Sequence, residues 1–280
     1  MKKLALCVLA YLISATSYKY VMAGESAVKN ISNNTEEKIR KLYEQIDFGN
    51  RSVLDYAVFE KGYKGYLNLK SEGKLSTEKD ILTVCDMSKS SKEYRLWVID
   101  MRTLKVLIND YVAHGQGSGE EFATAFSNNL NSHQSSIGFY VTDATYTGSH
   151  GLSLRMHGMD KGYNNAAYNR DIVVHGARYV CDNFVAQEGR LGRSWGCPAV
   201  SEKIADKLNH TIKDGTCRFV YYPEKKYLQT TYRINKEPGD TKESIFIASA
   251  NKKPVRIVYE YGPELQAAVD NTKWVKLPLL

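Results

Sequence analysis

The chain has 280 residues, with 38 Lys and Arg against 31 Asp and Glu and a formal net charge of +7. Proteins that bind nucleic acids gather their basic residues in a patch or stripe, whereas the basic residues here are scattered along the chain. Composition and charge therefore argue against a nucleic-acid partner. The numbers of basic and acidic residues are ordinary for a folded domain.

The N-terminus has the pattern of an export signal. Lys2 and Lys3 precede an apolar stretch over residues 4–15, and small residues before Gly24 form a cleavage site. A membrane span needs about 20 apolar residues, so we favour a signal peptide over residues 1–23 rather than a retained anchor. Removal of this signal lowers the net charge to +4. The mature protein is then expected in the periplasm or cell envelope, without stable membrane insertion.

Helices are expected first along the mature chain. Over residues 34–48 the apolar side chains share one helical face behind a capping threonine. A second helix is expected over residues 53–69, although Gly62 and Gly65 weaken its pattern. Residues 24–79 are therefore predicted to form a helical lead-in.

From residue 81 the apolar residues follow the pattern of β-strands. The expected strands are residues 81–85, 95–99, 103–113, 137–142, 172–174 and 217–222. The chain from 80 to 223 is therefore predicted to be a mostly β (α+β) domain. Polar, glycine-rich stretches at 115–136 and 146–170 are expected as loops, and loops of that length in a compact domain are usually functional.

The character of the sequence changes after Pro223. Residues 237–240 form a linker-like break, and residues 245–248 and 255–261 have the pattern of further strands. This part carries no motif that indicates a chemical function. We therefore treat residues 224–280 as a C-terminal extension without an assigned role.

Four cysteines remain once the signal is removed, and export permits disulfides. If Cys197 stays free to react, Cys85, Cys181 and Cys217 can form at most one bridge. Cys85 and Cys217 lie in strand patterns, where a cysteine also serves as a small buried hydrophobic residue.

The strongest chemical signal in the chain is Cys197, which follows Gly196 and precedes Pro198. A thiol needs a base to become a nucleophile at neutral pH. Gly196 permits a sharp turn that can aim backbone N–H groups at a developing oxyanion. Ser201 is a candidate cap of a following helix, whose N-terminal partial charge favours a thiolate.

His175 is the candidate base, because it ends an apolar strand and lies 22 residues before Cys197. One ring nitrogen can take the thiol proton while the other donates to the carbonyl of Gly176. A metal site is the alternative, but the histidines fit no common ligand spacing, so no metal or other cofactor is expected. Its ligands would be His150, His157, Asp160 and His175.

The segments His175-Gly176 and Ser194–Cys197 resemble the signature of the bacterial L,D-transpeptidases, the YkuD-like family. The likeness is closest to a murein L,D-transpeptidase branch with Arg-Ser-Trp-Gly-Cys-Pro-Ala-Val, the sequence of residues 193–200. Further matching blocks lie at residues 114–119, 126–128, 135–138, 152–154 and 160–164. The resemblance extends over residues 80–223 and implies a β-sandwich or barrel-like catalytic domain.

The resemblance also implies residue roles. Cys197 would be the acylated nucleophile, with His175 as its base, oriented by the carbonyl of Gly176. Ser194 would brace the loop, and the N–H groups of Gly196 and Cys197 would bind the oxyanion. Such enzymes attack the carbonyl at the L-centre of diaminopimelate in a tetrapeptide stem of peptidoglycan and expel D-alanine. An amine of a second stem then resolves the thioester.

The chain departs from the common family pattern at two positions. Trp195 replaces a histidine and cannot transfer protons, which leaves His175 as the sole base. Ala199 stands where an arginine is usual, so another guanidinium is needed to hold a substrate carboxylate. The candidate substrate-binding residues are Arg155, Tyr163, Asn164, Arg178, Arg193 and Trp195.

We therefore expect a cell-envelope cysteine L,D-transpeptidase whose partners are peptidoglycan stem peptides. An L,D-carboxypeptidase is the nearest rival, because it uses the same two residues and resolves the acyl-enzyme with water. A non-catalytic wall-binding protein with the same fold is the second rival. The intact Cys197, His175 and Gly196 favour an enzyme over this second rival.

Overall fold

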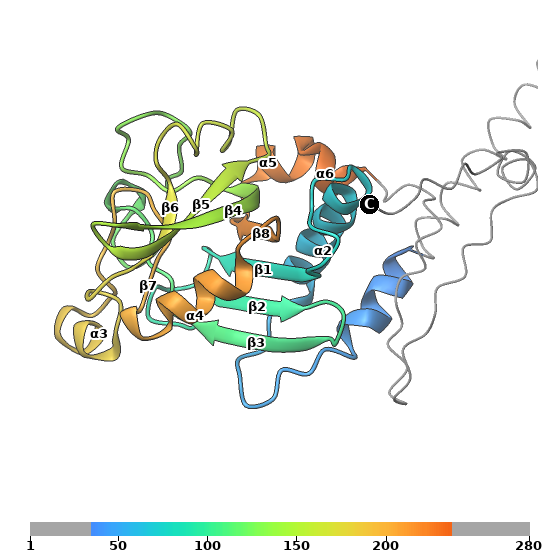
Figure 1. Cartoon of the computed structure of the whole chain (residues 1–280), viewed down its shortest axis with the longest axis horizontal. Helices are drawn as coiled ribbons and strands as arrows, with labels where there is room; N and C mark the ends of the chain where they lie inside the picture. The colour runs from blue at the N-terminus through green and yellow to red at the C-terminus, as the bar shows by residue number, and fades with distance from the viewer. Residues whose placement is uncertain (1–34, 237–280) are drawn as a thin grey trace, which may run out of the picture.

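The computed structural model describes residues 35–236, in which helices flank a large sheet (Figure 1). Residues 35–43 are helical. The helices that follow are α2 (Tyr56–Ser71), α3 (Asp182–Glu188), α4 (Glu202–Ile212), α5 (Lys225–Thr230) and α6 (Tyr232–Asn235), with a 3-10 turn at Gln116–Ser118. The strands are β1 (Ile81–Asp86), β2 (Leu96–Asp100), β3 (Lys105–Asp110), β4 (Gly138–Gly148), β5 (Gly151–Gly158), β6 (Val173–Gly176), β7 (Ala199–Val200) and β8 (Cys217–Tyr221).

The eight strands form one mixed sheet in the order β3-β2-β1-β8-β4-β5-β6-β7. The pairs β1–β8 and β6–β7 are parallel, and the remaining neighbours are antiparallel. This arrangement confirms the predicted mostly β, α+β class. Six of the eight strands, β1 to β4, β6 and β8, fall where the alternating pattern predicted them.

Helix α2 covers one face of the sheet. Because alternate strand residues point to opposite faces, Val84 of β1 and Phe219 of β8 join Phe59 of α2 in one core, whereas Cys85 and Val220 belong to the core on the other face. The carboxylate of Asp55 begins the helix by accepting the backbone N–H groups of Ala57 and Val58, at 2.7 and 3.3 Å. The helix predicted over residues 53–69 is thus present with slightly shifted ends.

The two glycines of α2 have a packing role that the sequence did not indicate. A Cβ at Gly65 would overlap the ring of Phe139, and one at Gly62 would lie 3.2 Å from the ring of Phe219. Glycine weakens an isolated helix, but here its missing side chain lets the helix backbone approach the sheet closely.

Helix α4 packs on the opposite face through Leu208 and Ile212, both fully buried. Ser201 lies at its N-cap position as predicted, but the hydroxyl makes no capping hydrogen bond. Strand β7 lies between Cys197 and the first turn of α4. A helix dipole acts mainly within its first turn, so the expected helix-dipole effect on the thiol is not supported.

The predicted loop over residues 146–170 is wrong in its first half. This stretch contains the end of β4 and all of β5, which pair as a hairpin around Gly148 and Gly151. Leu154 and Met156 are buried in β5 while Arg155 and His157 face outward, but the surrounding glycines and polar residues hid this alternation. The stretch from residue 115 to 136 does form a long loop, with one 3-10 turn as its only regular element.

Helices α3, α5 and α6 were not predicted. The side chains of α3 are all at least partly exposed, so the helix lacks the apolar face that a pattern search detects. Helices α5 and α6 are short, and each buries one side chain, Tyr227 and Ile234 respectively. The signal peptide and the strands expected at 245–248 and 255–261 lie outside the described residues.

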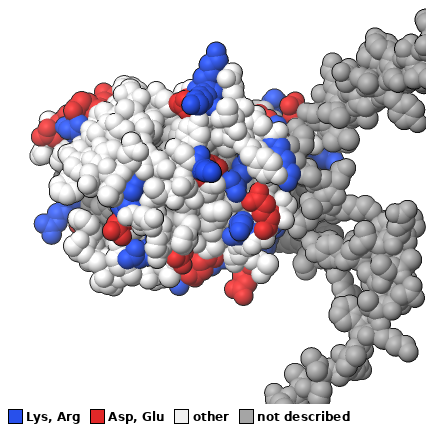
Figure 2. All heavy atoms as spheres, turned by 90° about the horizontal axis from the view of Figure 1, so that it is seen from above, with Lys and Arg blue, Asp and Glu red and all other residues white. Residues whose placement is uncertain are grey.

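All four described cysteines are free thiols. Cys85 and Cys217 are fully buried in β1 and β8, as expected for small hydrophobic residues, and Cys181 is partly exposed. Over residues 35–236, no helix is both long and apolar enough to cross a membrane. Basic and acidic side chains are interspersed on the face seen in Figure 2.

Candidate active site

Cys197 lies just before β7, at the edge of the sheet. The parallel pairing of His175 with Ala199 places Cys197 beside Val173, since both lie two residues earlier. The thiol accepts the backbone N–H of Val173 and donates to the carbonyl of Asp171, each at 3.5 Å. The nucleophile candidate is therefore held against the start of β6, with its side chain partly buried.

His175 occupies the third position of β6 and is 4 % exposed. Its Nδ1 lies 2.9 Å from the carbonyl of Gly176, the contact that the sequence analysis expected. A carbonyl can only accept, so this contact places the proton on Nδ1 and leaves Nε2 able to receive one. The imidazole also stacks on the ring of His150, with centroids 4.5 Å apart. His150 comes from the tip of the β4–β5 hairpin, and its role was not predicted.

The strand geometry brings the two candidate groups to neighbouring positions. Cys197 is held at Val173, two residues before His175 on the same strand. In residues 35–236, however, no hydrogen bond joins the thiol and the imidazole, because the thiol is directed to Asp171. Proton transfer requires the Cys197 side chain to leave this carbonyl.

Burial favours the neutral form of both the Cys197 thiol and the His175 imidazole. It raises the pKa of the Cys197 thiol, against the smaller opposing effects of the Val173 N–H and the Arg170 charge. It lowers the pKa of His175, partly offset by the Gly176 carbonyl, and His150 lowers it further. The resting pair is thus a thiol and a neutral imidazole, an arrangement suited to general-base activation.

The loop before Cys197 is shaped by Gly196, whose φ is +118°. The Ser194 hydroxyl donates to the carbonyl of Cys197 at 2.6 Å and accepts the N–H of Gly196 at 3.1 Å. Ser194 therefore braces the loop as expected, but the Gly196 N–H expected in an oxyanion hole is engaged by this hydroxyl. The Cys197 N–H has no partner among the described residues and is available to an oxyanion.

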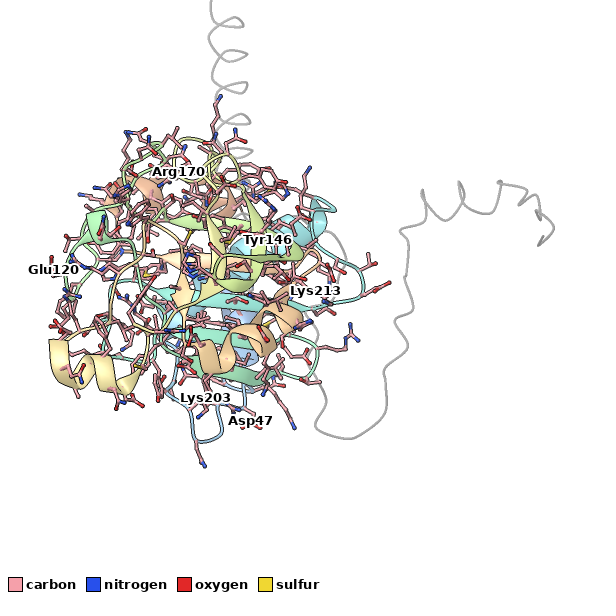
Figure 3. The ribbon with its side chains drawn as sticks, turned by 60° about the vertical axis from the view of Figure 1, so that its left-hand side comes forward. Asp47, Glu120, Tyr146, Arg170, Lys203 and Lys213 are labelled. Carbon is pink, nitrogen blue, oxygen red and sulfur yellow. The ribbon has the colours of Figure 1, made fainter. Side chains whose placement is uncertain are left out.

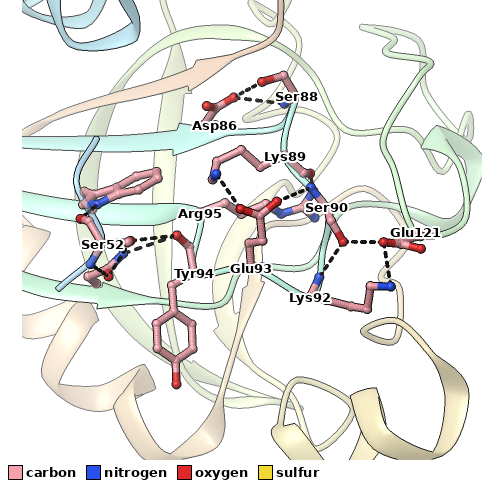
Figure 4. Close-up of polar contacts among 12 residues, drawn as sticks. Ser52, Asp86, Ser88, Lys89, Ser90, Lys92, Glu93, Tyr94, Arg95 and Glu121 are labelled. Carbon is pink, nitrogen blue, oxygen red and sulfur yellow. Dashed lines mark hydrogen bonds and ion pairs between the residues drawn. The ribbon is translucent and has the colours of Figure 1, made fainter. Parts of the chain in front are cut away.

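The buried guanidinium of Arg95 supports, through His114, the loop that carries Cys197. Arg95 is fully buried and donates to the carbonyl of Val112 and, at 2.8 Å, to Nδ1 of His114. Burial, together with the Arg95 charge, lowers the pKa of His114 to about 4, so its ring stays neutral. The carbonyl of His114 accepts the N–H of Ser194 at 3.1 Å. Figure 4 shows Arg95 beside the Ser90–Glu121 contact, which joins the connection between β1 and β2 to the long loop.

The outer face of β5 carries a stack of side chains around Arg155. The guanidinium of Arg155 lies 4.7 Å from the ring centroid of Tyr146 and 5.5 Å from that of Tyr168. Arg155 pairs with Val173 across β5 and β6 and reaches the carboxylate of Asp171 at 3.4 Å. Of the three arginines expected to bind a substrate carboxylate, Arg155 thus lies in the strand pair next to Cys197.

The other two arginines have different surroundings. Arg193 is engaged by Glu120 at 2.6 Å and by the carbonyl of Gly119 at 3.1 Å. The side chain of Arg178 is 91 % exposed and lies 3.6 Å from Glu202. Neither guanidinium is directed to Cys197 by any described contact.

The remaining three expected substrate contacts divide into one exposed ring and two packed side chains. Trp195 is 73 % exposed and stacks on His133, with centroids 4.9 Å apart. Asn164 is fully buried, where it donates to the carbonyl of Phe139 and accepts the N–H of Asp160. Tyr163 packs edge-on against Tyr227 at 4.8 Å. Asn164 and Tyr163 therefore make packing contacts in the scaffold, and the substrate-binding role expected of them stays a prediction.

The four residues of the alternative metal site are not brought together. His157 faces Asp143 at 3.1 Å, and His150 stacks on His175. Asp160 accepts the N–H of Phe139 and the Tyr227 hydroxyl, each at 2.8 Å. Within residues 35–236, no three His, Cys, Asp or Glu side chains cluster as metal ligands.

Arg170 and Ser135 are site residues that the sequence analysis missed. The Ser135 hydroxyl donates to the carbonyl of Gly196 at 3.2 Å. Arg170, labelled in Figure 3 above the hairpin that carries Tyr146, binds the loop around Ser135 through four hydrogen bonds. Both lie in polar stretches without periodicity. Ser135 belongs to one of the matching sequence blocks, which could have marked it, whereas Arg170 lies outside all of them.

Comparison with solved structures gives distant matches. An L,D-transpeptidase from Mycobacterium smegmatis is 15 % identical, with a TM-score of 0.32, and the match covers 51 % of this chain and 59 % of that one. L,D-transpeptidase 1 of Mycobacterium tuberculosis is 14 % identical, with a TM-score of 0.29 and coverage of 51 % and 62 %. An Enterococcus faecium L,D-transpeptidase is 12 % identical, with a TM-score of 0.31 and coverage of 51 % and 50 %. The chain thus spans between half and about three fifths of these proteins.

No curated protein sequence matches the chain. A family model described as the L,D-transpeptidase catalytic domain matches residues 49–221. The match covers more than half of the chain, including β1 to β8 and the loop that carries Cys197. The chain therefore belongs to the L,D-transpeptidase catalytic domain family.

Proposed function

We propose that this protein is an exported peptidoglycan L,D-transpeptidase that uses Cys197 as its nucleophile and His175 as its base. The observation that carries the proposal is the placement of a partly buried thiol beside β6, the strand that holds an imidazole with Nδ1 on the Gly176 carbonyl. Residues 1–23 would direct export to the periplasm or cell envelope, residues 80–223 would contain the catalytic machinery, and residues 24–79 would be its N-terminal lead-in.

The acylation step begins when the Cys197 thiol leaves the Asp171 carbonyl and gives its proton to Nε2 of His175. The thiolate attacks the carbonyl at the L-centre of diaminopimelate in a tetrapeptide stem. The resulting oxyanion can receive the Cys197 N–H, and the Gly196 N–H joins it if the Ser194 hydroxyl rotates away. The carbon–nitrogen bond to D-alanine then breaks as His175 returns the proton to the leaving amine.

Deacylation reverses these roles. The amine of a second stem gives a proton to His175 and attacks the thioester carbonyl. The carbon–sulfur bond breaks, a new amide forms, and the thiolate regains its proton. Two groups that stay neutral at rest and exchange one proton suit both halves of this reaction.

For substrate binding, Arg155 is the arginine whose position best supports carboxylate capture. Its planar guanidinium is held between Tyr146 and Tyr168 and faces one weakly engaged carboxylate, that of Asp171. A substrate carboxylate could replace Asp171 there by bidentate binding. Trp195 offers an exposed ring beside Gly196, suited to contact with the rest of the stem or glycan. Arg193 and Arg178 remain secondary candidates.

Product analysis separates this proposal from its two rivals. The mature protein is incubated with a tetrapeptide stem, with and without an added stem amine as acceptor, and the products are identified by mass spectrometry. We expect D-alanine release and an acceptor-dependent cross-linked dimer. Tripeptide without dimer would support the L,D-carboxypeptidase. Absence of turnover, with sacculus binding equal in wild type and Cys197→Ser, would support a wall-binding protein.

A further inference from the structure

Arg170 stands at the end of the turn before β6, one residue ahead of Asp171. Its Nη1 donates to the carbonyl of Ser127 and the hydroxyl of Ser136, both at 2.7 Å. Its Nη2 donates to the hydroxyl of Ser132 at 3.1 Å and the carbonyl of Gln134 at 2.9 Å. One guanidinium therefore binds four positions of the segment 127–136.

All four of these partners are neutral. Arg170 has no ion-pair partner within residues 35–236, and the neighbouring carboxylate of Asp171 is directed to Arg155 at 3.4 Å. Charges removed from water are normally paired with an opposite charge. A partly buried guanidinium without such a partner is an uncompensated positive charge.

This charge lies against the nucleophile loop. Nη2 of Arg170 would be 3.5 Å from a Cβ built on Gly196, and the Gln134 carbonyl that it binds would be 2.8 Å from the same point. On the other side, the carbonyl of Asp171 accepts the Cys197 thiol. Arg170 is thus connected to the loop of Cys197 from two directions.

We propose that Arg170 is a positioning residue whose positive charge stabilises the negative sulfur of Cys197 and whose four hydrogen bonds fix the loop that contacts Gly196. The inference rests on the proposed role of Cys197 as nucleophile. The other ionisable groups around the sulfur are Asp171 before β6, His175 in β6 and Tyr179 after it. The Arg170 charge opposes the rise that burial causes in the thiol pKa, and Asp171 adds to that rise.

The test measures the thiolate directly. Wild type, Arg170→Gln and Arg170→Lys are treated with iodoacetamide over a range of pH, and the rate of labelling of the peptide that contains Cys197 is followed by mass spectrometry. Only the thiolate reacts appreciably. Arg102→Gln, which removes an exposed guanidinium at the β2–β3 turn, is the matched control.

We expect the labelling midpoint of Arg170→Gln to move to higher pH, so that labelling near pH 7 is roughly five- to tenfold slower. Arg170→Lys keeps the charge and should stay closer to wild type, and Arg102→Gln should not differ from it. An unchanged midpoint in a folded Arg170→Gln, or an equal shift in both variants, contradicts the charge role. Thermal unfolding identifies a variant that has lost its fold, in which case Arg170→Lys alone decides.

The readout is independent of turnover. A shifted midpoint in a protein that releases no D-alanine would retain the role of Arg170 and reject the proposed function. An unshifted midpoint in a protein with transpeptidase activity would reject the charge role of Arg170 and retain the proposed function.

Discussion

Replacing His175 by Gln is expected to reduce D-alanine release by about 10²- to 10⁴-fold, the usual contribution of a positioned general base. Glutamine can still contact the Gly176 carbonyl, so the end of β6 should keep its conformation, but it cannot accept the thiol proton. Rates and thermal unfolding are compared with those of His210→Gln, a variant of an exposed histidine on α4. A His175→Gln enzyme with near wild-type turnover would mean that another group activates Cys197.

The pH dependence follows from the same residue. Burial lowers the pKa of His175, and protonation of the ring removes the base, so the acid limb of kcat/KM should lie below about pH 6.5, the ordinary value for histidine. The limb should disappear from the residual activity of His175→Gln. An acid limb above pH 6.5, or one that the substitution leaves unchanged, would assign it to a different group.

The second large loss of activity is expected from Gly196→Ala. The φ of +118° at Gly196 is unfavourable for any residue with a Cβ, and the new atom would lie 2.8 Å from the carbonyl of Gln134. The backbone strain costs about 1–3 kcal/mol. A displacement of the nucleophile loop by about 1 Å is enough for a loss of roughly 10²-fold in rate.

Gly189→Ala is a matched control for this substitution. Gly189 also has a positive φ, +68°, but nothing lies within 4 Å of its Cβ position. Urea unfolding and D-alanine release are measured on both variants. If Gly189→Ala loses as much activity as Gly196→Ala, general backbone strain, and not the close contact beside Cys197, accounts for the loss.

Much of the sheet could be predicted from the sequence, because strands buried on one or both faces keep a visible apolar pattern. Strands β1, β2 and β8 are of this kind. Strand β5 was missed because its outward residues, Arg155 and His157, belong to a polar surface and its ends are glycines. Helix α3 lacks a buried face, so nothing in its pattern distinguishes it from a loop.

For the site, the local sequence indicated the candidate nucleophile, the candidate base and the hydrogen bonds of Ser194 within the loop. It could not indicate contacts that depend on the sheet order. The pairing of β5 with β6 places Arg155 opposite Val173, and the folding of residues 127–136 over Gly196 brings in Arg170 and Ser135. The burial of Asn164 against Phe139 is likewise a tertiary property that its local sequence does not show.

The proposed function depends above all on acylation of the Cys197 sulfur. The most direct measurement is the mass of the intact protein after incubation with a tetrapeptide stem or a carbapenem, followed by peptide mapping of the modified residue. We expect one covalent adduct, located on Cys197 and absent from Cys197→Ala. No adduct in the wild-type protein, or an adduct and D-alanine release that persist in Cys197→Ala, would contradict it.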